Sequence, residues 1–538
     1  MKLEQIQMPV TNRLYTDYVT NSELIAPFFE YKLEAGVFSK RAQYLNSKSY
    51  KTEQLAEVIK QYMEPFGITP EVQNNIKRLS EGAFAIVGGQ QAGILTGPLY
   101  SVHKAITVIL LAKQQSEQLS KPVVPLFWIA GEDHDIEEIN HTYTIQKAKL
   151  NKRAYSIRSN KKYMASKTEY NKQEMIKTMQ QIFADYGETQ FTSSLLQDVL
   201  WHVENNETYT ELFTSMMNKM FGKYGLLMID AADECFRKFE SEYFARIVER
   251  SETIAKNVVE QELKLSNAGY GTPINATSSN VNLFYVKEGE RHLLEWHEGF
   301  ARNTVAQVKF TKEELLQLAA QSPENLSNNV VTRPLMQEMT IPVLAFVGGP
   351  GELAYWATLK PAFEILDLQM PIFKPRLHMT IVSRKVQALF ELLNVTVEDA
   401  FSGEMQQSLN SFIQSIQDKE SIEMIQNMEQ MLKEQYEKLE KQLQQVDVKI
   451  EPILIKNKHY HQQQLEYLRN KIRQEVLLKH DVKINQYTTI QLEIAPNNGF
   501  QERMYNPYMY FNEHGESLID DMLASNIELN GKHHVLYL

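Results

Sequence analysis

The segment that most restricts the possible folds of this chain spans residues 83–110. An apolar run at 83–87 leads into Gly88 and Gly89, and a segment with apolar residues at helical spacing follows. Thr96 precedes a glycine and a proline, so we expect its hydroxyl to cap this helix. The order strand, glycine-rich loop, helix predicts an open α/β sheet with a ligand site where the strand ends and the helix begins.

The loop departs from both common phosphate-binding patterns. Gln90 stands at the third position of G-x-G-x-x-G, where a dinucleotide requires a glycine, and Ile94 and Leu95 stand where a P-loop has Lys and Ser or Thr. The loop can still bind a ligand in another way. The candidate substrate-binding residues here are Gly88, Gly89, Gln90, Gln91 and Thr96.

His103 is a candidate catalytic residue on the predicted helix. The segment 97–103 is similar in spacing to the G-x-L-H-I-G-H segment of class I aminoacyl-tRNA synthetases and ends in this histidine. The alternative is structural, because His103 shares a helix face with Leu99, Ile106 and Leu110. A hydrogen-bonded core histidine would occupy the same position.

Four ionisable residues follow the next apolar run, at 121–130. They are Glu132, Asp133, His134 and Asp135. Two parallel strands joined by a helix form a right-handed unit, so this loop and the first should meet at one edge of the sheet. Neighbouring buried groups shift each other's pKa, as acid–base chemistry requires. Alternatively, Asp135 and Glu138 only start a helix as a capping box.

A third stretch repeats this arrangement, with an apolar run at 341–347, a glycine-rich turn, and a helix opened by Glu352. Alternatively, Glu352 has no role in binding, and its negative charge only interacts favourably with the positive end of the helix dipole. A guanidinium before the strand, at Arg333, suits a carboxylate or phosphate ligand. The candidate binding residues of this region are Asn329, Arg333, Gly349, Glu352 and Arg376.

From about residue 418 the composition changes to Gln, Glu and Lys with apolar residues at heptad spacing. One heptad position holds Ile422, Tyr436, Leu443 and Ile450, and the other holds Ile425, Leu432, Leu439 and Val446. A returning helix after Pro452 completes an antiparallel hairpin, whose apolar seam would suit a dimer contact. Beyond it, Glu502, Arg503, Tyr505 and Asn506 lie in an aromatic-rich segment that forms either a second nucleotide pocket or packing for the hairpin base.

Composition excludes several classes of protein. The single cysteine, Cys235, excludes an internal disulfide framework and a multi-cysteine zinc site. The net charge of −11 argues against a broad nucleic-acid surface. The apolar runs are too short to span a bilayer, and the first residues do not resemble a signal peptide. We therefore expect a cytoplasmic protein that binds neither nucleic acid nor membrane, and we predict no metal ligands while leaving a metal requirement open.

Five segments together resemble one family, the cysteine-adding enzymes of bacillithiol biosynthesis (the BshC family). They are 87–93 with 96–100, 130–135, 328–338, 349–352 and 501–503. The resemblance implies a synthetase-like, Rossmann-like α/β parallel-sheet core at 1–390 with connecting-peptide insertions at about 141–220 and 266–325. It also implies a helical coiled-coil domain at 391–495 that forms a homodimer, and a C-terminal segment at 496–538 that packs back on the core.

The resemblance also implies the reaction, in which L-cysteine is joined by an amide bond to glucosaminyl malate as the last step of bacillithiol biosynthesis. The carboxyl group must be activated, for which ATP or another nucleotide is expected. His103 would then act against phosphate charge, Asp133 and His134 would serve the incoming amine as base, and Arg333 would hold the malate carboxylates. The alternative from another class is a coiled-coil nucleotide-binding or scaffold protein with a vestigial synthetase-like α/β domain.

Overall fold

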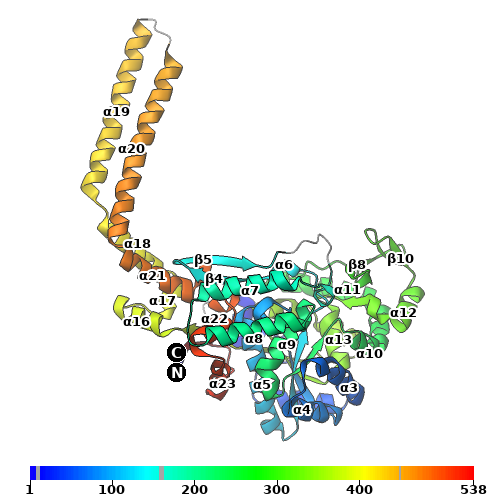
Figure 1. Cartoon of the computed structure of the whole chain (residues 1–538). Helices are drawn as coiled ribbons and strands as arrows, with labels where there is room; N and C mark the ends of the chain where they lie inside the picture. Colours follow the sequence, from blue (N-terminus) through cyan, green and yellow to red (C-terminus); the bar gives the residue numbers. More distant parts are fainter. Residues whose placement is uncertain (8–11, 157–162, 447–449) are drawn as a thin grey trace. The chain divides into compact units, whose positions relative to one another are not determined.

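The computed structural model describes residues 1–7, 12–156, 163–446 and 450–538. These residues form two compact units (Figure 1). The first unit combines Met1–Ile381 with Phe500–Leu538, and the second is Val382–Gly499. The boundary predicted at 391 falls inside helix α16 (Arg384–Leu393).

The first unit is built on a five-stranded parallel sheet, which confirms the predicted Rossmann-like α/β class. Its strand order is β13 (Ile372–Pro375), β12 (Val343–Gly348), β2 (Phe84–Gln90), β3 (Val123–Ile129) and β6 (Leu227–Asp230). Each strand pairs with its neighbours in parallel. The strands are continuous apolar runs because both faces of the sheet are covered.

Helices α5 (Leu99–Leu119) and α9 (Tyr209–Phe221) cover one face of the sheet, and α10 (Glu234–Phe239) lies on the other. Gly88 pairs with Phe127 in the sheet. Phe127 contacts Phe213 of α9, whereas the next residue, Trp128, packs against Phe236 of α10. Adjacent residues of a strand point to opposite faces, which places α9 and α10 on opposite sides.

Two details at the start of α5 differ from the prediction. Strand β2 does not stop at the glycines but continues through Gly88 and Gly89 to Gln90. A Cβ on Gly88 would lie 2.7 Å from Cγ2 of Val108, so the glycine is needed for α5 to pack closely on β2. Thr96 has a φ of 64° and does not cap the helix, whose N-cap is Pro98 without a side-chain hydrogen bond.

The polar insertions add two groups of elements to the central sheet, and α9 of the first group packs directly on it. The first contains the hairpin β4 (His141–Gln146) and β5 (Lys149–Ala154), followed by α7 (Lys172–Tyr186), α8 (Thr192–Asn205) and α9. The second is an antiparallel sheet in the order β10 (Val308–Phe310), β9 (Phe300–Asn303), β8 (Glu290–His297), β7 (Asn280–Lys287) and β11 (Leu326–Asn328). Helices α11 (Ser241–Asn267) and α12 (Lys312–Gln321) flank this insertion sheet.

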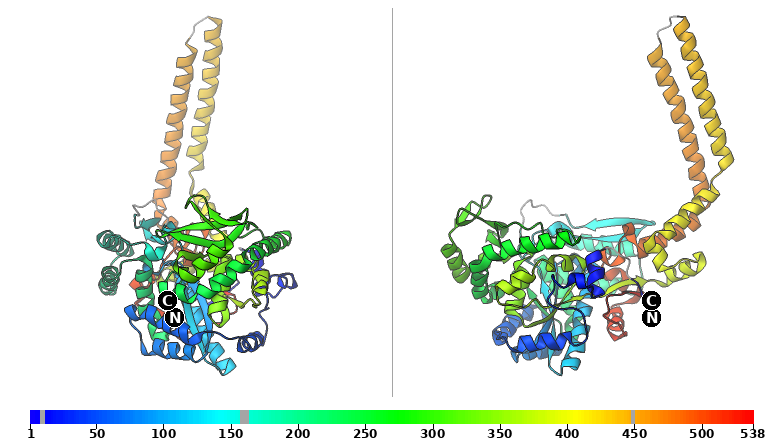
Figure 2. Two further views of the ribbon diagram at one scale, coloured as in Figure 1. Left: turned by 90° about the vertical axis from the view of Figure 1, so that its right-hand side faces the viewer. Right: turned by 180° about the vertical axis from the view of Figure 1, so that it is seen from behind.

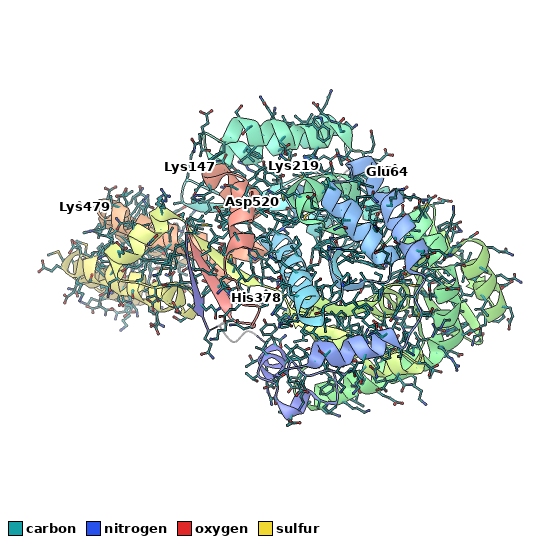
Figure 3. All side chains as sticks on the ribbon, turned by 90° about the horizontal axis from the view of Figure 1, so that it is seen from below. Glu64, Lys147, Lys219, His378, Lys479 and Asp520 are labelled. Atoms are coloured by element: carbon teal, nitrogen blue, oxygen red, sulfur yellow. The ribbon has the colours of Figure 1, made fainter. Side chains whose placement is uncertain are left out.

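Both ends of the chain join one small sheet in the first unit. Strand β15 (His533–Tyr537) lies between β1 (Lys2–Ile6) and β14 (His378–Val382). The two termini are consequently close together (Figure 2). His378, at the start of β14, is buried inside the unit (Figure 3). The N-terminal helices are α1 (Arg13–Val19), α2 (Val37–Asn46), α3 (Thr52–Met63) and α4 (Pro70–Ser80).

The second unit is helical, and its longest helices, α19 (Lys419–Gln445) and α20 (Glu451–Lys479), confirm the predicted antiparallel hairpin. Tyr436 and His461 bond at 2.7 Å across it. The shorter helices are α16, α17 (Val397–Ser402), α18 (Glu404–Ile416) and α21 (Asp481–Ile494). Among the described helices, none is both long enough and apolar enough to cross a membrane.

The heptad seam differs from the prediction in two respects. Helix α19 ends at Gln445, so Ile450 is not on its seam and instead precedes α20. Leu432 and Leu443 are half-buried within the hairpin, whereas Leu439 is 46% exposed. Val446, which follows the end of α19, is 55% exposed, so the seam is only partly closed within one chain. A separate row on α19 is open to solvent and consists of Met424, Met428 and Met431, which are 64%, 53% and 64% exposed.

Candidate active site

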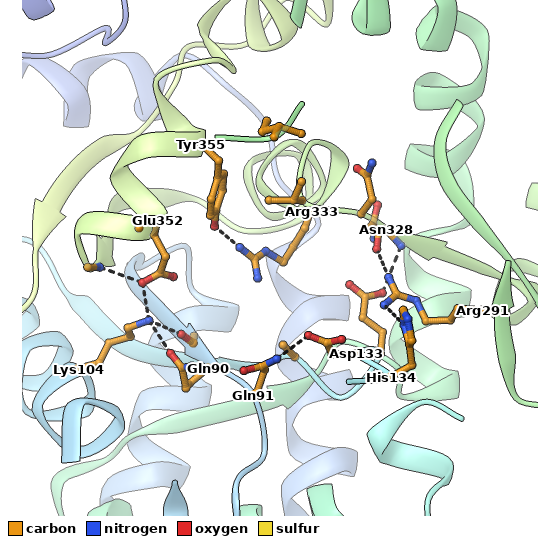
Figure 4. Close-up of a pocket in the computed structure, with 18 of the residues that line it drawn as sticks. Gln90, Gln91, Lys104, Asp133, His134, Arg291, Asn328, Arg333, Glu352 and Tyr355 are labelled. Carbon is orange, nitrogen blue, oxygen red and sulfur yellow. Dashed lines mark hydrogen bonds and ion pairs between the residues drawn. The ribbon is translucent and has the colours of Figure 1, made fainter. Parts of the chain in front are cut away.

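A cavity of about 640 Å³ opens in the first unit at the carboxyl ends of β2, β3 and β12 (Figure 4). The three predicted loops all contribute to its wall. They supply Gln90 and Gln91, Asp133 and His134, and Gly349 and Glu352. The insertion sheet forms part of the remaining wall, together with residues of α5, the segment 329–333, Arg376 and Arg503. The parallel topology therefore brings together residues that are up to about 260 positions apart in sequence.

Lys104 ties the ends of β2 and β12 together. Its Nζ donates to the carbonyl of Gly89 at 2.5 Å, to Oε1 of Gln90 at 3.1 Å and to Oε2 of Glu352 at 2.7 Å. The same oxygen of Glu352 accepts from the backbone N–H of Gly349 at 2.9 Å and caps α14 (Pro350–Trp356). Burial lowers the pKa of Lys104, and the adjacent Glu352 opposes that shift. All three protons of the ammonium group are thus used in holding the loops.

Asp133 and His134 both line the cavity, at its β3 side. Oδ2 of Asp133 accepts from Nε2 of Gln91 at 2.8 Å, and its Oδ1 accepts from the backbone N–H of Asp135 at 3.2 Å. Asp135 itself is exposed and is not among the described residues that line the cavity. The alternative capping box is also absent from this described segment, because Glu138 accepts from Gln91 and Asp135 makes no capping bond.

Glu132 touches the cavity but serves chiefly as an internal counter-charge. It pairs with the buried guanidinium of Arg237, and its Oε2 accepts from Oγ of Ser327 at 2.8 Å and from the backbone N–H of Asn328 at 3.2 Å. Arg237 also binds Glu240 at 2.8 Å. This network connects β3, α10 and β11, and therefore joins the central sheet to the insertion sheet.

Arg333 lies on the cavity wall on α13 (Thr332–Thr340). Its Nη2 donates to the hydroxyl of Tyr355, and its Nε has no hydrogen-bond partner among the described residues. Asn329 supports the start of α13, since its Oδ1 accepts from the backbone N–H groups of Val331 and Thr332 at 2.8 and 3.1 Å. The predicted guanidinium is thus in place, and no carboxylate of the described chain pairs with it within 4.0 Å.

Arg376 also reaches the cavity, but the buried carboxylate of Glu502, which lies outside the described cavity wall, neutralises its charge. Its Nη1 and Nη2 donate to Oε2 and Oε1 of Glu502 at 2.9 and 2.7 Å. Nδ1 of His103 and Nδ1 of His378 lie 3.1 and 2.9 Å from the same carboxylate. Burial lowers the pKa of both histidines, so each donates to Glu502 as a neutral ring. We call Glu502, Arg376, His103 and His378 the Glu502 network.

The position of His103 corrects the prediction that it faces a bound phosphate. It is fully buried in the Glu502 network and is not among the described residues that line the cavity. The N-terminus of α5 is also occupied, because the N–H of Leu99 donates to the carbonyl of Tyr505 at 2.7 Å. The surroundings of His103 therefore match the structural alternative, a hydrogen-bonded histidine in the core. Lys104, one residue further along the helix, reaches the cavity instead.

The predicted second nucleotide pocket in the C-terminal segment is not formed by the residues assigned to it. Glu502, Tyr505 and Asn506 are buried. Nδ2 of Asn506 donates to Oγ1 of Thr142 at 2.8 Å and to the hydroxyl of Tyr186 at 2.7 Å. Only Arg503 is exposed, and it lines the main cavity. These side chains fix the C-terminal segment to the core, which is the packing alternative.

The residues of the cavity wall that sequence reasoning missed include Lys104, Arg291 and Asn328. Lys104 follows His103 directly, and its position beside the predicted loop was the available signal. Arg291 lies in the second insertion, where no flanking motif marks it, whereas Asn328 begins the segment 328–338 and directly precedes the predicted Asn329. The described part of the chain holds no group of three or more His, Cys, Asp or Glu side chains arranged to bind a metal.

Comparison with known proteins matches both parts of the chain to one family. Residues 1–377 match the N-terminal Rossmann-like domain of bacillithiol biosynthesis BshC, and residues 379–538 match its C-terminal coiled-coil domain. A Lysinibacillus sphaericus protein named "Putative cysteine ligase BshC" is 52% identical over 538 residues. Proteins of the same name from Geobacillus kaustophilus and Bacillus cereus are 35% and 33% identical. Each alignment covers 100% of both chains.

Proposed function

The chain belongs to the BshC family of bacillithiol biosynthesis, and on this premise we propose that it is a ligase joining the carboxyl group of L-cysteine to the amine of glucosaminyl malate. The name shared by its relatives, cysteine ligase, supports the amide-forming class. The acceptor, and the place of this reaction as the last step of the pathway, are part of our proposal.

The observation that carries the proposal is the excess of positive charge in the cavity. Lys104 is paired with the carboxylate of Glu352, and Arg376 is paired with the carboxylate of Glu502. Arg291, Arg333 and Arg503 have no such partner among the described residues, which leaves three guanidinium groups facing the cavity. The malate part of the acceptor carries two carboxylates at neutral pH, and arginine binds carboxylates through paired N–H groups.

The chemistry requires activation of cysteine, because a carboxylate does not acylate an amine in water. We propose ATP or another nucleotide as the activating substrate. Attack of the carboxylate oxygen on phosphorus expels pyrophosphate or a nucleoside diphosphate and gives an acyl adenylate or acyl phosphate. The amine nitrogen then attacks the acyl carbon, the C–O bond breaks, AMP or phosphate leaves with the electron pair, and the amine loses a proton.

The base that receives this proton is proposed to be Asp133 or His134. Both line the cavity next to the guanidinium groups that would hold the acceptor. Asp133 is oriented by Gln91 and by the backbone at Asp135. His134 lies beside Arg291, with Nδ1 3.5 Å from its Nη1. General base catalysis requires one of these two groups to come within hydrogen-bond distance of the reacting amine, and their place on the cavity wall allows this.

We also propose that the protein is a cytoplasmic homodimer formed through the hairpin, and the exposed methionine row on α19 supports this. The scaffold alternative gives no reason for unpaired guanidinium groups in a cavity at the strand ends. An unneutralised charge in such a cavity is costly unless a ligand pairs with it.

The direct test incubates the purified protein with L-cysteine, glucosaminyl malate and ATP and measures the amide product by mass spectrometry. Release of AMP or of ADP identifies which bond of the nucleotide breaks. A deletion strain should accumulate glucosaminyl malate, and a plasmid copy carrying Arg333→Ala should fail to reverse this. A deletion strain with ordinary levels of glucosaminyl malate, together with no amide product from any nucleoside triphosphate, would refute the proposal.

A further inference from the structure

We propose that Arg291 is a specificity-determining residue that binds the second carboxylate of a dicarboxylate substrate, while Arg333 binds the first. The identity of that substrate as glucosaminyl malate rests on the proposed function. Arg291 would then be the residue that distinguishes a dicarboxylate from a monocarboxylate. Selection of the substrate would take place at the insertion sheet and not at the glycine loop.

The guanidinium of Arg291 is held in a fixed position by its neighbours. Its Cζ lies 4.0 Å from the ring centroid of Phe284, in cation–π contact. Nη2 donates to the backbone carbonyl of Asn328 at 2.6 Å. These contacts join β8, β7 and β11, so three strands of the insertion sheet fix the direction of the side chain. Figure 4 shows the group at the opposite end of the site from Lys104.

The charge of Arg291 is not neutralised by the protein. The nearest acids are engaged elsewhere, since Glu132 pairs with Arg237 and Asp133 accepts from Gln91. Burial lowers the pKa of Arg291; the attraction of Glu132 and Asp133 opposes this shift, and the like charges of Arg237 and Arg333 add to it. An anion bound between Arg291 and Arg333 would relieve this repulsion.

Two further features of this end of the cavity indicate a missing ligand. Nε of Arg291 has no hydrogen-bond partner among the described residues. The side chain of Asn328 is only 1% exposed, and both Nδ2 and Oδ1 are unpartnered in the described chain. Buried polar groups in proteins are nearly always satisfied, so each exception needs an explanation. An amide N–H next to a guanidinium is a suitable second donor for a carboxylate.

A phosphate group would bind to the same kind of hydrogen-bond donors, but the position of Arg291 favours binding of the acceptor substrate. His134 lies at this end of the cavity, with Nδ1 3.5 Å from Nη1 of Arg291. A substrate bound by Arg291 is therefore placed beside a proposed base, where the amine must react. The nucleotide phosphates would instead lie nearer Arg503, a further guanidinium of the cavity wall, whose Cζ lies 5.9 Å from the ring centroid of Tyr100.

The experiment compares L-malate with L-lactate, which replaces the CH₂–carboxylate of malate with a methyl group. Isothermal titration calorimetry on the full chain should show malate binding at least tenfold more tightly than lactate. Arg291→Gln should weaken malate binding roughly tenfold to a hundredfold, the range for losing hydrogen bonds to a charged group. It should change lactate binding less than twofold. Arg302→Gln, on β9 and outside the described cavity wall, should leave both affinities unchanged.

Equal weakening of malate and lactate by Arg291→Gln would overturn the inference, as would loss of inorganic phosphate binding with malate binding intact. Arg291→Lys keeps the charge and should give an intermediate malate affinity, which separates charge from misfolding. The two proposals fail differently. Amide formation by Arg291→Gln with an unchanged KM for glucosaminyl malate would overturn only this inference. Malate selectivity without any amide formation would overturn only the ligase.

Discussion

Replacing Glu502 with glutamine removes one negative charge from the interior of the first unit while nearly keeping the shape of the side chain. Glu502 is 1% exposed and accepts hydrogen bonds from Arg376, His103 and His378 and from the backbone N–H of Met379 at 3.3 Å. Glutamine can accept through only one of its two terminal atoms. The variant therefore leaves the buried charge of Arg376 without a counter-ion.

The expected loss of stability follows from this burial. Removing one partner of a buried ion pair costs about 3–5 kcal/mol. With a urea dependence of about 4 kcal/mol per M for a unit of this size, the unfolding midpoint should fall by roughly 1 M. A comparable change at a surface pair costs at most about 1 kcal/mol. The matched control is Glu242→Gln, whose partner Lys51 lies 2.7 Å away and whose side chain is 50% exposed.

Tryptophan fluorescence is the appropriate assay because all four tryptophans, at 128, 201, 296 and 356, belong to the first unit. The signal therefore reports the unit that contains Glu502 and not the helical hairpin. Equal midpoints for Glu502→Gln and Glu242→Gln would refute the reasoning, because they would show that Arg376 does not depend on this carboxylate.

The effect of Glu502→Gln on stability should also depend on pH. Burial would raise the pKa of Glu502, but the charge of Arg376 and the bonds from the two histidines outweigh it and hold this pKa well below its ordinary value. A lowered pKa in the folded state means that the carboxylate stabilises the fold fully above its unfolded pKa of about 4.3. This contribution is lost as the pH falls from there through the folded pKa. The difference between the midpoints of wild type and Glu502→Gln should begin to shrink below about pH 4 and should disappear only below the folded pKa of Glu502.

Three further predictions concern catalysis, packing and self-association. His134→Ala should slow amide formation about 10²–10⁴-fold if it is the base, with calorimetric affinities for both substrates kept; wild-type turnover would assign it a structural role. Gly88→Ala should destabilise the first unit by about 1–3 kcal/mol in urea unfolding, because its Cβ would lie 2.7 Å from a methyl group of α5; unchanged stability would show that the helix can move away. Lysine at Met424, Met428 and Met431 together should give a monomer in light scattering, and an unchanged dimer would exclude this row as the contact.

The sequence predicted the central sheet well because its strands are buried on both faces. The apolar runs before Gly88, Gly131 and Gly348 each became a parallel strand, and the polar residues after them meet at the cavity. The length of β2 was underestimated because glycine was interpreted as a loop residue. In the structure, the absence of a side chain on Gly88 is what allows α5 to approach.

The partners of individual side chains were not predictable in the same way. His103 is bound to Glu502, which lies 399 positions later, and no periodicity connects two such residues. Lys104 is one residue from His103 and points to the cavity because successive helical residues differ by about 100° in direction. Arg291 comes from an insertion without a motif, so its relation to Arg333 became visible only once β8 was placed beside the cavity.

The discontinuity of the first unit has a consequence for synthesis of the protein. Glu502 and β15 are translated only after Val382–Gly499, a segment of about 120 residues that takes roughly 6–24 s to elongate at 5–20 residues per second. Until then the growing chain holds β1 and β14 without the strand between them, and Arg376 without its carboxylate. The helical hairpin therefore leaves the ribosome before the last elements of the Rossmann-like unit are synthesised, and that unit cannot be completed until translation is nearly finished.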